Sequence, residues 1–158
     1  LLDSYLQRLS PLAESEAFPQ YSCEKGGSID ILARVGHGRG VKPRVIELKD
    51  EYTKQEPQSH AMKQAAIYAT FIAYLLRSDI ADKWWNAFGF NIDIPKSLVI
   101  PVVTLMPLPA EKPEEEIIGS FTVGGLDDVT LECHSIYYEL LDGNKFRLIS
   151  DNYTDIIR

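Results

Sequence analysis

Two acids and a lysine stand inside apolar runs of the chain. Asp30 lies in the run IDILA (29–33), and Glu47 and Lys49 lie in the run VIELK (45–49). Ionisable groups inside buried segments cost free energy unless they are paired or bind a metal. Neighbouring carboxylates repel each other, and a hard divalent cation relieves that repulsion. The pattern therefore predicts a Mg²⁺ site, or a Mn²⁺ site in its place, with Asp30 and Glu47 as ligands.

Such a site is suited to the hydrolysis of phosphate esters. A bound divalent ion acidifies its water and polarises a phosphoryl oxygen. Proteins typically hold Mg²⁺ with one or two carboxylates, while waters and substrate phosphates complete its shell. Lys49 is expected at the edge of the site, where it positions or helps to deprotonate the water, or stabilises negative charge.

The two runs are expected to form one antiparallel hairpin. Both are short, rich in β-branched residues and bounded by Gly or Pro, as strands are. The Gly-rich loop 36–43 can fold the chain back between them, which would place Asp30 beside Glu47. Because side chains alternate across a strand, Glu47 and Lys49 project from the same face.

A helix with a polar stripe is expected after the hairpin. Ser59 is the expected N-cap, and His60, Gln64 and Tyr68 follow at intervals of four residues on one stripe. The other faces are apolar, which is typical of a buried helix. Gln64 is interpreted as supporting the site by a hydrogen bond to a phosphate or a bound water. The alternative, a satisfied polar group between helix and sheet, is the simpler interpretation of Tyr68 and His60.

In this order, Asp30, Glu47-x-Lys49 and Gln64-x-x-x-Tyr68 resemble the motifs of the PD-(D/E)XK nuclease superfamily. Asp30 matches the first motif acid, with an isoleucine in place of proline before it. The resemblance covers roughly the first two-thirds of the chain. It implies an α/β, restriction-endonuclease-like core with a mixed central β-sheet flanked by helices. It also implies Mg²⁺-dependent hydrolysis of phosphodiester bonds, with Asp30, Glu47, Lys49 and Gln64 as the catalytic residues.

A third metal-binding acid is not assigned. The spacing of leucines predicts an amphipathic helix over residues 1–14, and members of the resembled family often carry a further Glu there. Asp3 is the only acid well inside this helix, and Glu14 and Glu16 lie at or past its end. None matches that position.

The charge distribution bears on the partner. The net charge is −7, which is unusual for a nucleic-acid binder. Residues 25–49, however, hold six bases against two acids, and a basic patch around two acids suits a phosphate backbone. Arg39 and Lys42, together with Tyr68, are the candidate contacts to nucleic acid, with DNA as the first choice. A solvated hairpin tip is the alternative interpretation of the basic residues.

The remaining segments complete the expected architecture. A strand is expected over 18–24, and a short helix over 80–88 is expected to end at Gly89. The apolar run 97–106 is expected to be a strand that lies at an edge, or is bulged or broken at Pro101, because proline lacks the ladder donor. Strands are expected to form a small C-terminal β addition over 117–123, 129–141 and 146–149.

These segments are expected to form a single domain of 158 residues, with a core over about 1–106 and a β extension over about 117–158. The chain opens on Leu1, so a fragment of a larger protein, with an additional domain, is an alternative; a homodimer is another. Cys23 and Cys133 lack ligand-like spacing, which favours a reduced, cytoplasmic protein. No apolar run is long enough for a membrane span.

Three functions fit this pattern. The first is a metal-dependent nuclease. The second is a catalytically weak or inactive nuclease-fold module in nucleic-acid binding or protein assembly, which the net negative charge favours. The third is a metal-dependent phosphoesterase that acts on nucleotides. Only proteins that bind the polymer should show a steep dependence of affinity on salt.

Overall fold

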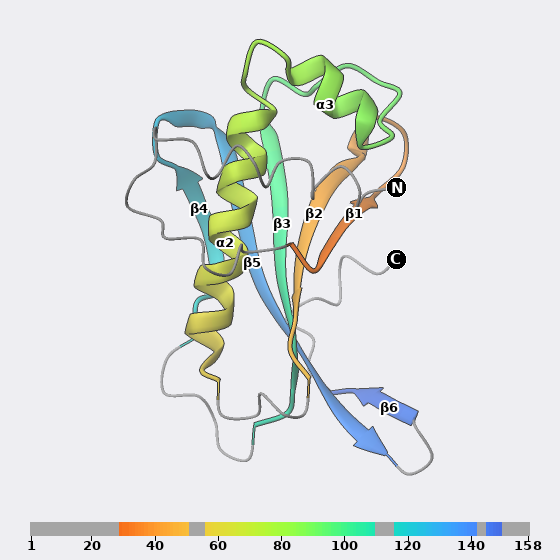
Figure 1. Cartoon of the computed structure of the whole chain (residues 1–158), viewed down its shortest axis with the longest axis vertical. Coiled ribbons are helices and arrows are strands. Elements are labelled where there is room, and N and C mark those ends of the chain that lie inside the picture. Colours follow the sequence, from red (N-terminus) through yellow and green to blue (C-terminus); the bar gives the residue numbers. More distant parts are fainter. Residues whose placement is uncertain (1–28, 51–55, 110–115, 142–144, 150–158) are drawn as a thin grey trace, which may run out of the picture.

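The computed structural model describes residues 29–50, 56–109, 116–141 and 145–149. This part of the chain is an α/β fold with a mixed, open six-stranded sheet and two helices (Figure 1). The strand order is β1-β2-β3-β5-β4, and β6 pairs with β5. The elements are β1 (Ile31–Val35), β2 (Lys42–Leu48), α2 (Gln58–Leu75), α3 (Ala81–Ala87), β3 (Leu98–Pro107), β4 (Gly119–Val123), β5 (Leu126–Leu141) and β6 (Lys145–Leu148).

The expected hairpin is confirmed. β1 and β2 pair antiparallel from Ile31 opposite Ile46 to Val35 opposite Lys42. The connection requires glycine at residue 36, where φ is +86° and a Cβ atom would lie 2.4 Å from the carbonyl oxygen of Gly40. The hairpin geometry therefore depends on this one glycine more than on its glycine neighbours.

Gly36→Ala is expected to lower the free energy of unfolding by about 1–3 kcal/mol, because the substitution combines a left-handed backbone with a clash against backbone. Gly40→Ala is the matched control, since φ at Gly40 is not left-handed and an added Cβ would have no described neighbour within 4 Å. Its effect should stay within about 0.5 kcal/mol. Denaturant unfolding measures both, and equal losses would contradict this account of the turn.

β3 is an inner strand, so the expectation that it lies at an edge is wrong, and its pairing with β5 is neither bulged nor broken at Pro101. It pairs parallel with β2 from Val102 onward, and with β5 along its whole length, including Pro101 opposite Glu132. Proline has no backbone N–H to donate. It is tolerated at residue 101 because pairing with β2 begins one residue later, so no carbonyl group of β2 needs a hydrogen bond from Pro101.

The strands expected near the C-terminus are confirmed, but β5 is not an addition to a core that ends near residue 106. It pairs parallel with β3 and places Leu131 and Cys133 in the hydrophobic core with residues of β3. β4 pairs with β5 at one edge of the sheet. Beyond Tyr138, β5 continues as a hairpin with β6, which projects away from α2 (Figure 1) and leaves Phe146 exposed.

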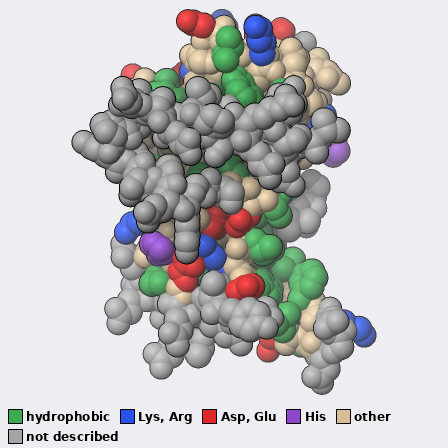
Figure 2. Space-filling model, in the orientation of Figure 1, with side chains coloured by type: hydrophobic (Ala, Val, Ile, Leu, Met, Phe, Trp, Pro, Cys, Tyr) green, Lys and Arg blue, Asp and Glu red, His purple; other side chains and the backbone are tan. Residues whose placement is uncertain are grey.

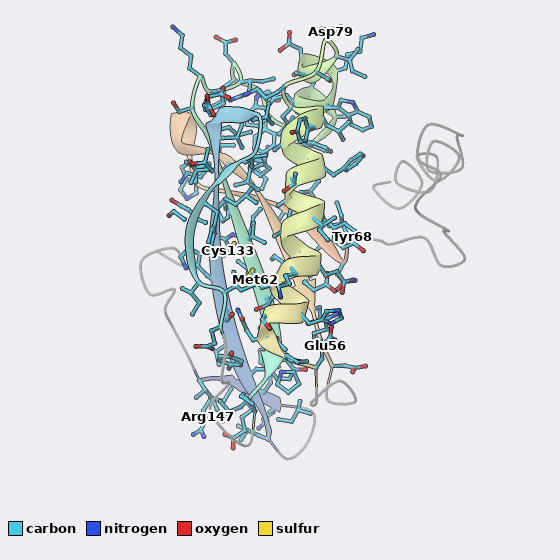
Figure 3. The ribbon with its side chains drawn as sticks, turned by 90° about the vertical axis from the view of Figure 1, so that its left-hand side faces the viewer. Glu56, Met62, Tyr68, Asp79, Cys133 and Arg147 are labelled. Carbon is cyan, nitrogen blue, oxygen red and sulfur yellow. The ribbon has the colours of Figure 1, made fainter. Side chains whose placement is uncertain are left out.

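α2 packs on one face of the sheet, across β2, β3 and β5 (Figures 1 and 3). Its buried face holds Met62, Ala65, Ala69 and Ile72. The expected N-cap at Ser59 is wrong. The N-cap is Pro57, whose extended backbone ends the preceding segment, and Ser59 lies within the first helical turn.

Other expectations have mixed outcomes. The short helix is confirmed as α3, and Gly89 follows it with φ +82°. The elements expected over 1–14 and 18–24 lie outside the described residues, as does Cys23. Cys133 is a buried free thiol, and burial raises its pKa to about 11. Neither described helix has the length and apolarity needed to cross a membrane.

Candidate active site

The face of the sheet under α2 carries a polar row. Glu47 on β2 pairs in register with Thr104 on β3, which pairs with Ser135 on β5. Val45, two residues before Glu47, packs in the core with Met62 of α2. Because side chains alternate along a strand, Glu47 and Lys49 project towards α2 as well. Glu47, Thr104 and Ser135 are all buried.

Asp30 lies beside Glu47. Ile31 pairs with Ile46 in the hairpin, so the next position outward sets Asp30 opposite Glu47 on the same face. The Oδ2 atom of Asp30 accepts a hydrogen bond of 2.9 Å from the backbone N–H of Leu48. This bond ties the exposed Asp30 carboxylate to β2 at the residue between Glu47 and Lys49.

Glu47 is a buried carboxylate with one unused oxygen. The residue is 2% exposed, and its Oε1 accepts a hydrogen bond of 2.8 Å from Lys49. Its Oε2 is buried and has no hydrogen-bond partner among the described residues. Burial raises the pKa of Glu47, and the negative charge of Asp30 adds to that rise, while the hydrogen bond from Lys49 opposes it. A buried oxygen without a partner is costly, and a cation placed between Glu47 and Asp30 would remove this cost.

Lys49 donates to three acceptors. Its Nζ lies 2.8 Å from Oε1 of Glu47, 3.2 Å from Oε1 of Gln64 and 3.3 Å from Oε2 of Glu56. Its backbone is fixed by a hydrogen bond to Leu105 and by one from the Tyr138 hydroxyl. Burial acts to lower the pKa of Lys49, but the hydrogen bonds and charges of Glu47 and Glu56 outweigh it and raise the pKa. Lys49 is therefore a charged ammonium at neutral pH.

α2 brings Gln64 to this ammonium, as the sequence predicted that it would lie near the site. The Nε2 atom of Gln64 is directed to the hydroxyl of Tyr68 at 3.5 Å, a long contact. Tyr68 is partly buried and packs against the core. The structure thus joins Tyr68 to the site through Gln64, and no hydrogen bond described in the structure links it to Asp30 or Glu47.

Lys42, one of the two predicted basic contacts, does not project towards this site. Lys42 lies an odd number of residues from Glu47 on β2, so it projects from the opposite face of the sheet. There it forms an ion pair of 3.8 Å with Glu132. Arg39 belongs to the tight turn Gly38–Gly40, and its side chain lies outside the described part of the structure.

Glu56 was missed by the sequence analysis. Its Oε1 lies 2.7 Å from Nδ1 of His60, while its Oε2 faces Lys49. Figure 3 shows Glu56 and Tyr68 along the same side of α2. Spacing could have indicated its contact with His60, four residues later, but not its contact with Lys49, because Glu56 precedes the N-cap Pro57 of α2.

The donor set fits a hard divalent cation. Among the described residues no three His, Cys, Asp or Glu side chains form a metal-binding group. Mg²⁺ does not need three, because one or two carboxylates suffice when waters and phosphate oxygens complete the shell. Figure 2 shows acidic and basic side chains gathered near the middle of the side that carries α2. Asp30 and Glu47 supply the two carboxylates.

The raised pKa of Glu47 predicts a pH dependence of stability without metal. The folded protein binds this proton more tightly than the unfolded chain, so Glu47 lowers the free energy of unfolding as pH rises from 4.5 through its folded pKa. Glu47→Gln removes this loss. The stability of Glu47→Gln minus that of wild type should therefore rise across this window. Denaturant unfolding in EDTA from about pH 4 to about pH 8 measures the difference, and a constant difference would contradict the prediction.

Comparisons of the chain with protein-family models, with curated proteins and with solved structures found no match. A functional assignment therefore depends on the motif residues and on the geometry described above.

Proposed function

We propose that this chain is a metal-dependent nuclease with a restriction-endonuclease-like fold, which hydrolyses phosphodiester bonds of nucleic acid. One observation carries the proposal. Glu47 holds a buried carboxylate oxygen that has no partner among the described residues, beside Asp30 and next to the Lys49 ammonium. A carboxylate pair and a lysine in this arrangement are costly for folding alone, whereas they suit a site for a cation and a phosphate.

Asp30 and Glu47 would hold Mg²⁺ or Mn²⁺. When bound, the ion supplies an acidified water and neutralises charge on the phosphoryl group. The backbone N–H of Leu48 orients Asp30 for this role through its hydrogen bond to Oδ2. The remaining oxygen of Asp30 and Oε2 of Glu47 are the atoms available to the ion.

Lys49 stabilises negative charge on the substrate phosphate. Its raised pKa keeps it protonated, so it donates hydrogen bonds and does not serve as the base. Gln64 holds the ammonium through the contact of 3.2 Å. The carboxylate of Glu47 thus acts on the cation, and the ammonium of Lys49 acts on the phosphate. Gln64 ties this ammonium to α2.

Calorimetric titration with Mg²⁺ and with Mn²⁺ tests the proposal directly. The wild type should show saturable binding that is lost in the double variant Asp30→Ala, Glu47→Ala. Asp128→Ala, Glu139→Ala is the matched control, because it also removes two acids, each of which is ion-paired on the surface. Binding that survives in the first double variant would refute the site. No binding to wild type, even with a phosphodiester present, would favour the non-catalytic module.

A further inference from the structure

The Lys49 ammonium lies between two carboxylates, and they differ in their surroundings. Glu47 approaches from β2 at 2.8 Å with a side chain that is 2% exposed. Glu56 approaches from the segment before α2 at 3.3 Å with a side chain that is 18% exposed. Lys49 itself is 12% exposed, so both ion pairs are largely shielded from water. Attraction between charges is stronger in such surroundings than at an open surface.

Glu56 is held in place from its far side. His60, one helical turn along the chain, contacts Oε1 of Glu56 at 2.7 Å, which leaves Oε2 for Lys49. Glu47 differs, because its second oxygen is directed to no described partner. Glu47 is therefore the carboxylate with an oxygen available to a cation, and Glu56 is the carboxylate engaged on both oxygens.

We propose that Glu56 is a positioning residue, which holds the Lys49 ammonium in the site when a divalent cation binds Glu47. The inference rests on the proposed function. A cation at Glu47 weakens the hold of that carboxylate on Lys49 and repels the ammonium, because like charges at short range oppose each other. The carboxylate of Glu56 remains paired with Lys49, because the cation does not bind Glu56. Gln64, a neutral acceptor, cannot supply that charge.

Glu56 should therefore affect the affinity for the cation indirectly, through its hold on Lys49. Without the charge of Glu56, Glu47 is the one described carboxylate still paired with the ammonium, and a cation must compete with Lys49 for it. Glu56→Gln should therefore weaken Mg²⁺ binding by about threefold to fivefold, the upper part of the range measured for single ion pairs. In a Lys49→Met background no ammonium competes, and Glu56→Gln should change the affinity by less than about twofold.

Two measurements on the same four proteins test the inference: wild type, Glu56→Gln, Lys49→Met and the double variant. Denaturant unfolding in EDTA should give a coupling between Glu56 and Lys49 of about twofold to fivefold in the unfolding equilibrium constant. Calorimetric titration with MgCl₂ should then show the loss of affinity only where Lys49 is present. Glu132→Gln, which removes a carboxylate ion-paired to Lys42 on the opposite face, should leave the Mg²⁺ affinity unchanged.

The outcomes separate the two proposals. Absence of coupling in EDTA overturns the role of Glu56. An equal loss of Mg²⁺ affinity with and without Lys49 also overturns it, because Glu56 would then act on the cation directly. Failure of wild type to bind Mg²⁺ or Mn²⁺, even with a phosphodiester present, overturns the metal site, and the EDTA measurement alone then decides whether Glu56 holds Lys49.

Discussion

Glu47→Gln should lower the rate of phosphodiester cleavage by about a thousandfold or more, because a bound metal ion contributes several kcal/mol to the stabilisation of the reacting phosphate. Glutamine keeps the shape of the side chain and can still accept from Lys49 through its carbonyl oxygen. It removes the anionic oxygen that lacks a partner among the described residues. The loss of activity should therefore occur without loss of the fold.

The measurement is cleavage of plasmid DNA and of single-stranded DNA and RNA with Mg²⁺ or Mn²⁺, together with an unfolding curve for each variant. Asp30→Asn should behave as Glu47→Gln does, and Glu132→Gln should cleave as wild type. A Glu47→Gln protein that keeps more than about a tenth of wild-type activity would exclude Glu47 as a metal ligand. Release of phosphate from nucleotides, without cleavage of polymers, would indicate the phosphoesterase function instead.

Gln58→Ala should lower the free energy of unfolding by about 3 kcal/mol, the largest effect on stability that we predict for a polar residue. Gln58 is 2% exposed and joins the start of α2 to β5 and to the segment before β4. Its amide donates to Ser135 at 2.5 Å and to the carbonyl of Ile117 at 3.1 Å, and it accepts from the N–H of Ile117 at 2.8 Å. Truncation leaves the N–H and the carbonyl of Ile117 without this partner, whereas Ser135 keeps its contact of 2.9 Å with Thr104. Each group left unpaired away from water costs about 1–3 kcal/mol.

Denaturant unfolding of Gln58→Ala measures this loss, and Lys63→Ala is the control, since Lys63 is exposed on the same helix. The control should change stability by no more than about 0.5 kcal/mol. A loss below about 1 kcal/mol for Gln58→Ala would show that water replaces the amide, and that the network does not fix α2 to the sheet.

The elements with strong local signals could be predicted from sequence. The hairpin follows from two β-branched runs around a Gly-rich loop, and its register places Asp30 opposite Glu47. The place of β3 could not be predicted in this way. Its partners on β2 and β5 are distant in the sequence, and Pro101 is compatible with an inner strand only because the β2 ladder begins at Val102. The position of β3 within the sheet is therefore set by its pairing partners and not by its own residues.

Part of the candidate site could also be predicted from sequence. Asp30, Glu47, Lys49 and Gln64 come together because strand alternation and helical spacing are regular. The contact between Glu56 and Lys49 depends instead on the path of the segment between β2 and α2, which no periodicity specifies. Alternation along β2 does predict that Lys42 projects from the face opposite Glu47, because 42 and 47 differ by an odd number. The proposed contact of Lys42 with nucleic acid rested on charge and did not take this alternation into account.

The parallel ladder has a consequence for the order of folding. Val45 pairs with Val102, which pairs with Cys133, so the centre of the sheet joins segments that are far apart in the chain. Such contacts form slowly because long loops must close first. The groups proposed for chemistry, from Asp30 to Gln64, belong instead to one contiguous stretch with short closures. We therefore expect Asp30 and Glu47 to meet early, on a hairpin that is still open to solvent, and Glu47 to become buried only when β3 and β5 join the sheet.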